Sequence, residues 1–442
     1  GGGFELVLRT RPGAAAVSCP IVTSTPSPGA SPYPGSEPPL NPTVSRSVPG
    51  TMLVALALSG AIGPFATDTY LPALPLIVDE FEVSASTAQL TLTAFMAALA
   101  VGQLVIGPLS DRLGRRGLLI AGSVGTMVAA VACASAPSIW VLVLARVAQG
   151  FFGAAGIVLG KAIVVDVGRG PGVAKAFATL MAIQSVAPVI APLFGGAVVP
   201  FGGWRGVFWL LAALSAVTLV GVIAAVPESL PVADRRAGGL RSTLADMHAV
   251  ASYGPFAARV TAFVFTFGVL FAYISASPFV YQDMVGLSPS AYAVAFTVNA
   301  LGILVSSLAG ARLVGRFAPE KLLLTGMTGM VSAIVYLVVV ALSPAGTLNL
   351  APVTVGFVLL TLSVGLAMPN AAALSMQATR GRSGSGSALL GAGQFGLAAL
   401  VSPLTGLAGP NSAVPMLLVM GTCAAIVLVA VRGVFSLPLR AT

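Results

Sequence analysis

Long apolar stretches alternate with short polar ones over most of the chain. Each apolar stretch reaches the roughly 20 residues that a helix needs to cross the hydrocarbon core of a membrane. The pattern predicts an all-α integral membrane protein with twelve transmembrane helices, near residues 50–78, 85–109, 117–136, 138–165, 173–200, 204–226, 256–281, 290–314, 321–342, 350–375, 384–409 and 413–436.

A longer polar segment at residues 227–255 separates six predicted helices from six. We expect it to be a central loop between an N-terminal half, 48–226, and a C-terminal half, 256–442, that ends in a short tail. Residues 1–47 contain "STPSPGASPYPGSEPPLNPTVS", which is rich in Pro, Ser and Gly and lacks apolar periodicity. Such a segment cannot bury enough apolar surface to offset chain ordering, so we expect a disordered tail.

Composition and charge agree with a membrane protein. Hydrophobic residues make up 57% of the chain and charged ones 8%, against roughly 25% charged residues in soluble domains. If the N-terminus is cytoplasmic, basic residues fall in or beside loops on one side, and only Arg205 falls in an external loop. This asymmetry follows the positive-inside rule, places both termini in the cytoplasm and accounts for the net charge of +9 without a nucleic-acid partner.

The two halves show a weak internal repeat. A shift of 204 residues superposes "DRLGRRGLLIAG" (111–122) on "GRFAPEKLLLTG" (315–326), each between the second and third helix of its half. The spacing predicts parallel halves related by an axis along the membrane normal. Such halves form a binding cavity at their interface and alternate its access between the two sides.

The segment "GPLSDRLGRR" (107–116) resembles the loop signature of the major facilitator superfamily. The resemblance implies the superfamily fold and a loop that latches one conformation. An alternative is that these residues only set the orientation of the chain. Gly315 stands where the first half has Asp111, so the second latch is degenerate. The predicted latch residues are Gly107, Asp111, Arg112, Gly114 and Arg115.

A second motif, "LARVAQG" (144–150), resembles the fourth-helix motif of the family. Arg146 would lie about 12 Å inside the membrane, at a depth comparable to that of Asp68, and Gln149 shares its helix face. An arginine at mid-membrane costs roughly 2.5 to 3.5 kcal/mol, so it normally faces a cavity or a partner. Two interpretations are open, a site that couples protons to substrate and a purely structural ion pair with Asp68.

Asp68 lies in "FATDTYLPALP" (65–75), near the end of the first predicted helix. The affinity of a buried carboxylate for a proton depends on its neighbours and on water, both of which change between conformations. In the drug antiporters that this segment resembles, the matching carboxylate serves both proton and drug. The resemblance therefore implies that Asp68 couples proton entry to substrate release.

The fifth predicted helix contains "APVIAPLFGG" (187–196), which resembles the antiporter motif of the family. Paired prolines bend a helix and small residues let helices approach closely, although generic membrane packing explains this composition too. Ala191 replaces the usual glycine before the second proline. The motif residues are Pro188, Pro192, Gly195 and Gly196.

Three further stretches resemble the bicyclomycin and chloramphenicol resistance group, Bcr/CflA: "YISASPFVYQDMVGLSP" (273–289), "PNAAALSM" (369–376) and "GSALLGAGQFG" (386–396). One departure is Val165, where the group tends to carry Arg, which leaves the pairing of Asp166 open. Candidate pocket residues are Tyr273, Asn299, Asn370 and Gln394, with Phe95, Phe271 and Tyr281 as aromatic walls. The alternative is that these rings face lipid or a neighbouring helix, as a Phe in a membrane helix does more often than it faces a ligand.

Other classes find little support in the sequence. The only Gly-Lys pair, at Gly160, is followed by Ala162, so no nucleotide-binding G-x-x-x-x-G-K-[ST] run occurs. Three scattered cysteines and the single His248 predict no metal site, and we expect no cofactor and no enzyme activity.

We therefore expect a proton-driven exporter of small amphipathic drugs. It would be monomeric, in contact with lipid in a bacterial inner membrane, and without a nucleic-acid partner. The alternatives are a proton-coupled symporter or facilitator of a small nutrient with the same fold, and a non-transporting sensor.

Overall fold

The computed structural model describes residues 48–168, 171–235, 240–342, 349–379 and 382–436. The described residues are helical throughout, apart from turns and one isolated bridge between Val314 and Phe317. The predicted all-helical fold is therefore confirmed. The tail predicted for residues 1–47 lies outside the described residues.

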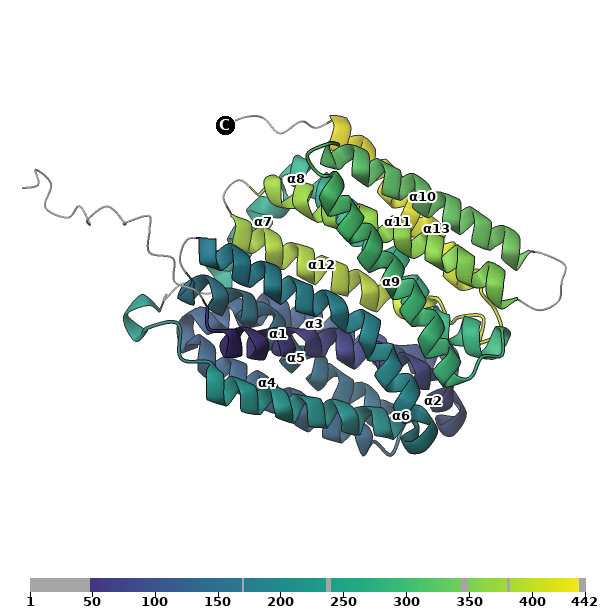
Figure 1. Cartoon of the computed structure of the whole chain (residues 1–442), viewed down its shortest axis with the longest axis horizontal. Coiled ribbons are helices and arrows are strands. Elements are labelled where there is room, and N and C mark those ends of the chain that lie inside the picture. The colour runs from purple at the N-terminus through teal and green to yellow at the C-terminus, as the bar shows by residue number, and fades with distance from the viewer. Residues whose placement is uncertain (1–47, 169–170, 236–239, 343–348, 380–381, 437–442) are drawn as a thin grey trace, which may run out of the picture. The chain divides into compact units, whose positions relative to one another are not determined.

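The helices fall into two groups in chain order (Figure 1). The N-terminal half contains α1 (Gly50–Asp68), η1 (Leu71–Ala73), α2 (Leu74–Phe81), α3 (Ala85–Leu113), α4 (Arg115–Ala134), α5 (Ile139–Val167) and α6 (Pro171–Ala225). A linker carries η2 (Val232–Asp234) and α7 (Leu240–Ala251). The C-terminal half contains α8 (Gly254–Phe279), the π-helical turn η3 (Val280–Met284), α9 (Pro289–Leu313), α10 (Pro319–Ala341), α11 (Leu350–Gln377), α12 (Ser383–Leu404) and α13 (Val414–Ser436).

Eleven helices in the described residues are long and apolar enough to cross a membrane. The count differs from the twelve predicted spans because α6 contains two of them, those predicted at 173–200 and 204–226. The two join at Gly203, whose φ of 57° and ψ of −160° are not helical. Glycine adopts such angles readily because it has no Cβ, so one residue can separate the two spans.

The first predicted span is broken in its interior. The helix α1 ends at Asp68, a 3₁₀ turn follows, and α2 completes the crossing. Proline has no N–H, so Pro72 cannot donate to the carbonyl of Asp68 and Pro75 cannot donate to that of Leu71. Because of the break, the last carbonyl groups of α1 lie inside the protein rather than at its surface.

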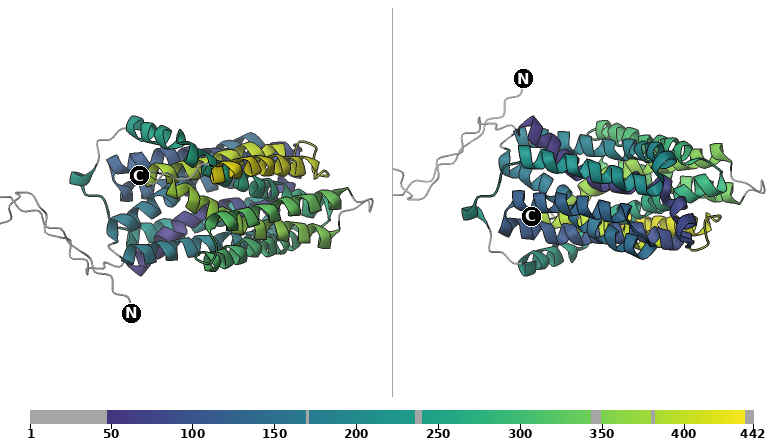
Figure 2. Two further views of the ribbon diagram at one scale, coloured as in Figure 1. Left: turned by 90° about the horizontal axis from the view of Figure 1, so that it is seen from above. Right: turned by 90° about the horizontal axis from the view of Figure 1, so that it is seen from below.

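Within each half the helices pack closely, and the halves meet along two helix pairs. The helix α3 packs on α12, and α6 packs on α9. In Figure 1 the N-terminal half lies below and the C-terminal half above this interface, and Figure 2 shows the same helices from two further sides.

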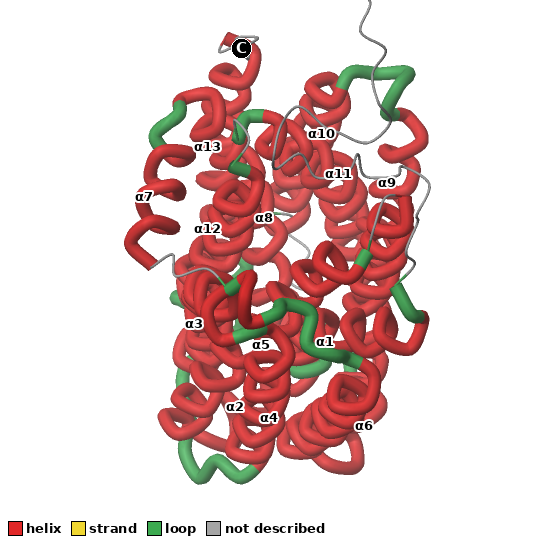
Figure 3. Tube along the Cα trace, turned by 90° about the vertical axis from the view of Figure 1, so that its left-hand side faces the viewer, coloured by secondary structure: helices red, strands yellow, loops and turns green. Residues whose placement is uncertain are grey.

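We call the end of the bundle at which α3 ends and α4 begins the basic end, and the other the opposite end. Figure 3 looks at the basic end, where α7 also lies. The central segment, predicted as a loop, thus contains a helix, which packs against α12 and α3. The basic end carries Arg112, Arg115, Arg116, Arg235, Arg316, Lys321 and Arg382.

Gln89 joins the two halves near the opposite end. Its side chain is fully buried and donates to the Ser275 carbonyl at 2.9 Å and to the Thr405 hydroxyl at 3.0 Å. Ser86 and Thr93, on the same helix, donate to carbonyls of α12 at 2.8 and 3.0 Å. The described conformation therefore holds the halves together at the opposite end.

Replacing Gln89 with Ala should loosen this closure. Two lost hydrogen bonds amount to about 1–2 kcal/mol net, or roughly tenfold in the population of the open state. To measure the open population, Ala399→Cys is made in a chain without its native cysteines. The readout is the rate at which a membrane-impermeant reagent, added at the opposite end, labels this cysteine. The control is Gln103→Ala on the same helix, which should leave the rate unchanged; equal rates in both variants would contradict the role of Gln89.

Candidate functional site

Arg146 is the most deeply buried charge in the described residues. It lies on α5 with 0% exposure. Its guanidinium donates to the Ala66 carbonyl at 3.0 Å, to Gln149 Oε1 at 2.7 Å and, more weakly, to the Thr91 carbonyl at 3.4 Å. Arg146 thus connects α5 to α1 and α3.

Aromatic rings enclose the same guanidinium. Its central carbon lies 4.2 Å from the centre of the Phe95 ring, 5.1 Å from that of Tyr70 and 5.8 Å from that of Phe208. A cation over a desolvated ring is stabilised by the ring quadrupole. Phe95, predicted as a cavity wall, instead packs on Arg146.

The charge of Arg146 is compensated by a helix end rather than by a carboxylate. Ala66 belongs to the last turn of α1, whose unpaired carbonyls carry partial negative charge. Because the break after Asp68 leaves these carbonyls inside the protein, they form a ready site for a cation. Arg146 occupies it.

Asp68 therefore stands apart from Arg146. It is 6% exposed, and neither a hydrogen bond nor an ion pair joins its carboxylate to another described residue. The structural ion pair considered from the sequence is thus absent from the described conformation. Nε and Nη1 of Arg146 bind carbonyls and Gln149, and Nη2 is buried without a hydrogen-bond partner among the described residues.

A tyrosine cluster lies in the C-terminal half, on the helices that the turn after Asp68 meets. The turn η1 packs on α8 and α9, which carry Tyr273 and Tyr292. Asn299 Nδ2 donates to the hydroxyls of Tyr273 at 2.9 Å and Tyr281 at 3.1 Å. All three tyrosines and Asn299 are at most 1% exposed.

The other predicted pocket residues lie apart from this cluster. Asn370 donates to the Leu366 carbonyl of its own helix at 2.8 Å. Gln394 is half-buried on α12, and Phe271 stacks on Phe267. Within the described residues neither Asn370 nor Gln394 hydrogen-bonds to Tyr273 or Asn299.

The glycines predicted as an antiporter motif lie at two backbone contacts. A Cβ on Gly195 would stand 2.1 Å from the Thr69 carbonyl oxygen, directly after Asp68. A Cβ on Gly196 would stand 2.5 Å from Ala293 of α9. Ser290 Oγ also donates to the Gly196 carbonyl at 2.8 Å. Pro188 and Pro192 lie on the same part of α6, which thus touches both the turn after Asp68 and the other half.

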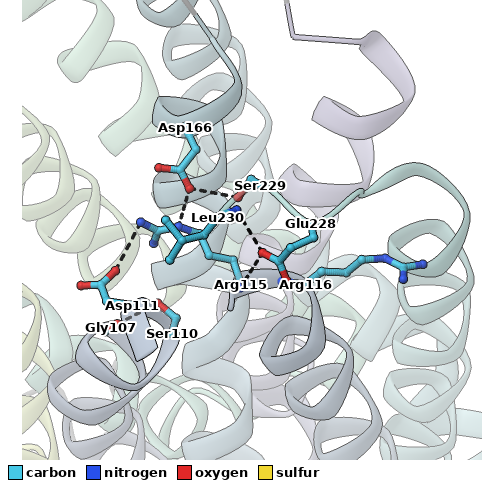
Figure 4. A network of polar contacts seen from close by, with 9 residues as sticks. All are labelled: Gly107, Ser110, Asp111, Arg115, Arg116, Asp166, Glu228, Ser229 and Leu230. Carbon is cyan, nitrogen blue, oxygen red and sulfur yellow. Dashed lines mark hydrogen bonds and ion pairs between the residues drawn. The ribbon is translucent and has the colours of Figure 1, made fainter. Parts of the chain in front are cut away.

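Arg115 is the centre of the predicted latch at the basic end (Figure 4). It pairs with Asp111 at 3.3 Å and forms a second ion pair with Asp166 of α5. Asp166 also accepts a hydrogen bond from Ser229 at 2.9 Å. The pairing of Asp166, left open by Val165, is therefore supplied by Arg115 and Ser229.

Glu228, which sequence reasoning missed, caps α4. It accepts hydrogen bonds from the N–H groups of Arg115 at 2.9 Å, Arg116 at 3.3 Å and Leu230 at 3.1 Å. Partial burial acts to raise the pKa of Glu228, but these donors and the charge of Arg235 outweigh it and lower the pKa below its usual value. The only signal in the sequence is an acid just after the sixth span.

Arg116, next to the predicted latch residues, donates to the carbonyls of Val226 at 2.8 Å and Ile223 at 3.1 Å, at the end of α6. The remaining latch residues have separate roles. Gly114 has a φ of 96°, and its missing side chain leaves room for Arg235 and Glu228. The Gly107 carbonyl accepts a bond from Ser110 at 2.7 Å. Arg112 is exposed.

No three His, Cys, Asp or Glu side chains of the described residues lie close enough to hold a metal ion.

Comparison with known proteins identifies the family of the chain and supports its fold. The family model described as Major Facilitator Superfamily matches residues 56–403. The Uncharacterized MFS-type transporter YdgK of Bacillus subtilis is 34% identical over 394 residues, 87% of this chain and 95% of that protein. The bicyclomycin resistance protein homolog of Haemophilus influenzae is 26% identical over 374 residues, 85% and 93% of the two chains. A crystal structure of a bacterial homologue of the human lysosomal transporter Spinster superposes with a TM-score of 0.67 at 18% identity, covering 87% and 96%, which shows the fold alone.

The close contacts of α6 predict the effect of adding single methyl groups. Gly195→Ala and Gly196→Ala should each destabilise the protein by about 1–3 kcal/mol, because the methyl group meets the Thr69 carbonyl oxygen in the first variant and the Ala293 Cβ in the second. Gly396→Ala on α12 is the matched control, since nothing lies within 4 Å of its Cβ position. Thermal unfolding in detergent would measure the effects. Equal unfolding temperatures for all three variants would refute the contacts.

Arg146→Lys should destabilise the fold despite keeping the charge. A lysine cannot reach the Ala66 carbonyl and Gln149 together in one plane, and it stacks less well on Phe95. We expect a loss of roughly 3 kcal/mol from two charge-assisted hydrogen bonds, measured by unfolding in detergent. Leu144→Ala, at a 69% exposed position on the same helix, should have little effect. An unchanged unfolding temperature in Arg146→Lys would show that the positive charge alone stabilises the fold.

The cap formed by Glu228 predicts a pH dependence. Its folded-state pKa is lowered, so its stabilisation is present above the unfolded value of 4.5 and is lost as the pH falls through the lower folded value. Glu228→Gln should therefore lower the unfolding temperature at pH 7, and the gap to the wild type should close below about pH 4. Glu82→Gln, an exposed acid at the opposite end, is the control. A gap independent of pH would contradict the charged cap.

Proposed function

The chain belongs to the Major Facilitator Superfamily, and we propose that it is a proton-coupled exporter of small amphipathic drugs. It would exchange protons for drug by alternating access between two halves. No cofactor is needed, since the proton gradient drives transport. We propose a monomer in a bacterial inner membrane, with both termini and the basic end in the cytoplasm.

The observation that carries the proposal is Asp68. A carboxylate that is buried inside a membrane-spanning segment, lacks an ion-pair partner and lies at a break in its helix can bind and release a proton as its surroundings change. Gly195 and Gln282 place α6 and the C-terminal half against the same turn. A movement of the halves relative to each other therefore changes the groups that surround Asp68.

The described conformation fits one step of such a cycle. The Gln89 contacts hold the opposite end closed, and under the proposed orientation this end faces outward. Asp68 would then exchange its proton with the cytoplasm. The latch around Arg115 and Glu228 ties α3, α4, α5 and the end of α6 together at the basic end, so the N-terminal half can move as one body.

The proposed substrate class comes from the relatives and from the interior. One relative is named a bicyclomycin resistance protein homolog. In the C-terminal half, Tyr273 packs on the rings of Phe296 and Phe357, and Asn299 and the tyrosine hydroxyls supply hydrogen-bonding groups there. Apolar walls with few polar anchors suit varied amphipathic molecules.

Proton movement in inside-out vesicles with an acidic lumen tests the proposal. Adding bicyclomycin-like and chloramphenicol-like drugs to wild-type vesicles should release protons, and Asp68→Asn should abolish the release. Asp79→Asn, an exposed acid on the same span, should behave as wild type. Release that persists in Asp68→Asn would move the proton site elsewhere. If nutrients instead drive protons and solute in the same direction, the protein is a symporter.

A further inference from the structure

Prolines inside the membrane-spanning helices leave carbonyl groups without their usual donor. A proline has no N–H, so the carbonyl four residues before it loses its helical hydrogen bond. A buried carbonyl without a donor costs free energy, because it has also lost its contact with water. Pro200 of α6 and Pro403 of α12 release the carbonyls of Gly196 and Ala399 in this way, and both of these residues are buried.

Hydroxyl groups of the other half bind both released carbonyls. Thr93 of α3 donates to the Ala399 carbonyl at 3.0 Å, and Ser290 of α9 donates to the Gly196 carbonyl at 2.8 Å. The two contacts lie in the two helix pairs at which the halves meet, α3 with α12 and α6 with α9 (Figure 1). Each contact therefore joins the halves through a carbonyl that lacks its usual donor in its own helix.

The donors occupy equivalent places in the two halves. Ser290 and Thr297 lie 204 residues after Ser86 and Thr93, which is the shift that superposes the loop segments of the two halves. All four hydroxyls donate to carbonyls across the interface, at 2.8 to 3.1 Å. The internal repeat thus extends to the donors that join the halves.

A third proline has the same local chemistry within one half. Pro369 of α11 releases the Gly365 carbonyl, and Ser307 of α9 donates to that carbonyl at 2.8 Å. Both helices belong to the C-terminal half. This contact therefore does not join the two halves, and it serves as the natural comparison for the other two.

We propose that Pro200 and Pro403 keep the opposite end closed by providing carbonyl acceptors for the other half, and not only by bending their helices. When the halves separate at this end, Thr93 and Ser290 withdraw and each released carbonyl loses its donor. The closed state is thus favoured by groups that carry no charge. The inference rests on the proposed alternating access only in that the halves separate at this end, and it involves neither proton nor drug.

Replacing each proline with alanine tests the proposal. Alanine returns an N–H to the helix, so the carbonyl keeps a donor when the halves separate, and opening costs less. We expect Pro403→Ala and Pro200→Ala each to raise the ratio of open to closed molecules by roughly two- to tenfold, the equivalent of one net hydrogen bond.

A buried cysteine at the interface reports the open population. Ser402 is fully buried on α12, and its hydroxyl donates to the Gln89 carbonyl of the other half at 3.4 Å. Ser402→Cys is made in a full-length chain without its native cysteines, in membrane vesicles and without substrate. The readout is the rate at which a membrane-impermeant reagent, added on the side of the opposite end, labels this cysteine.

Pro369→Ala is the matched control, because the carbonyl that it concerns is bound within one half. Its labelling rate should equal that of the parent chain. Equal increases in all three proline variants would overturn the proposal, since they would reflect helix bending or a general loosening. Unchanged rates in Pro200→Ala and Pro403→Ala would overturn it as well.

Pairs of substitutions separate the carbonyl from the bend. If Pro403 acts through Thr93, then Pro403→Ala should add little to the effect of Thr93→Val, because the contact is already lost. Pro403→Ala should add in full to Ser290→Ala, which affects the other helix pair. Full additivity of Pro403→Ala with Thr93→Val would show that the proline acts by bending alone, and the proposal would be wrong.

The hydroxyl variants also provide the test if a proline variant fails to fold. Thr93→Val and Ser290→Ala must then each raise the labelling rate, while Ser307→Ala, the same loss within one half, must not. Any other pattern would contradict the proposal.

The labelling result is independent of the drug assay. Raised rates in the expected variants, together with no drug-linked proton release from the wild type, would support the contacts and reject the proposed antiport. Drug-linked release that is lost in Asp68→Asn, without raised labelling rates, would support the antiport and reject the contacts.

Discussion

The interaction on which the membrane interior depends is the bond between Arg146 and the last turn of α1. A buried guanidinium requires compensation, and here a helix end provides it, supported by Gln149 and the Phe95 ring. This helix end lies inside the protein because the first span is interrupted after Asp68, where Pro72 cannot donate to the Asp68 carbonyl. The proline in the sequence, the break in the helix and the buried charge of Arg146 therefore depend on one another.

This arrangement separates two tasks that a simple ion pair would merge. Arg146 holds α1, α3 and α5 together, while Asp68, two residues after Ala66, is left free to respond to its surroundings. The turn after Asp68 is touched by Gly195 from the same half and by Gln282 from the other. The carboxylate thus lies where any relative movement of the halves changes its neighbours.

Much of the architecture follows from hydrophobic length, because a span must cover the membrane thickness. The division into two sets of helices and the all-helical class were predictable for that reason. The junction of two spans within α6 at a single residue was not, since only the backbone angles of Gly203 show how they join. Nor was α7, whose short helix in a polar segment depends on packing against α12 and α3.

The candidate site shows the same limit. Sequence patterns singled out Asp68, Arg146, Gln149 and the glycines of α6, but depth along a helix does not reveal direction, so the suggested ion pair was wrong for this conformation. Glu228 and Gln89 escaped notice because their partners are backbone groups or residues far along the chain, such as Arg115 N–H and the Ser275 carbonyl. Backbone partners leave no trace in side-chain patterns.

The cap on α4 has a consequence for biosynthesis. The N–H groups at the start of α4 receive their partner from Glu228, which the ribosome adds more than a hundred residues later. Until then this helix end relies on water or lipid headgroups. Because Glu228 directly follows the sixth span, the last span of the N-terminal half and the cap arrive together, and the first half completes its structure before most of the second half has been translated.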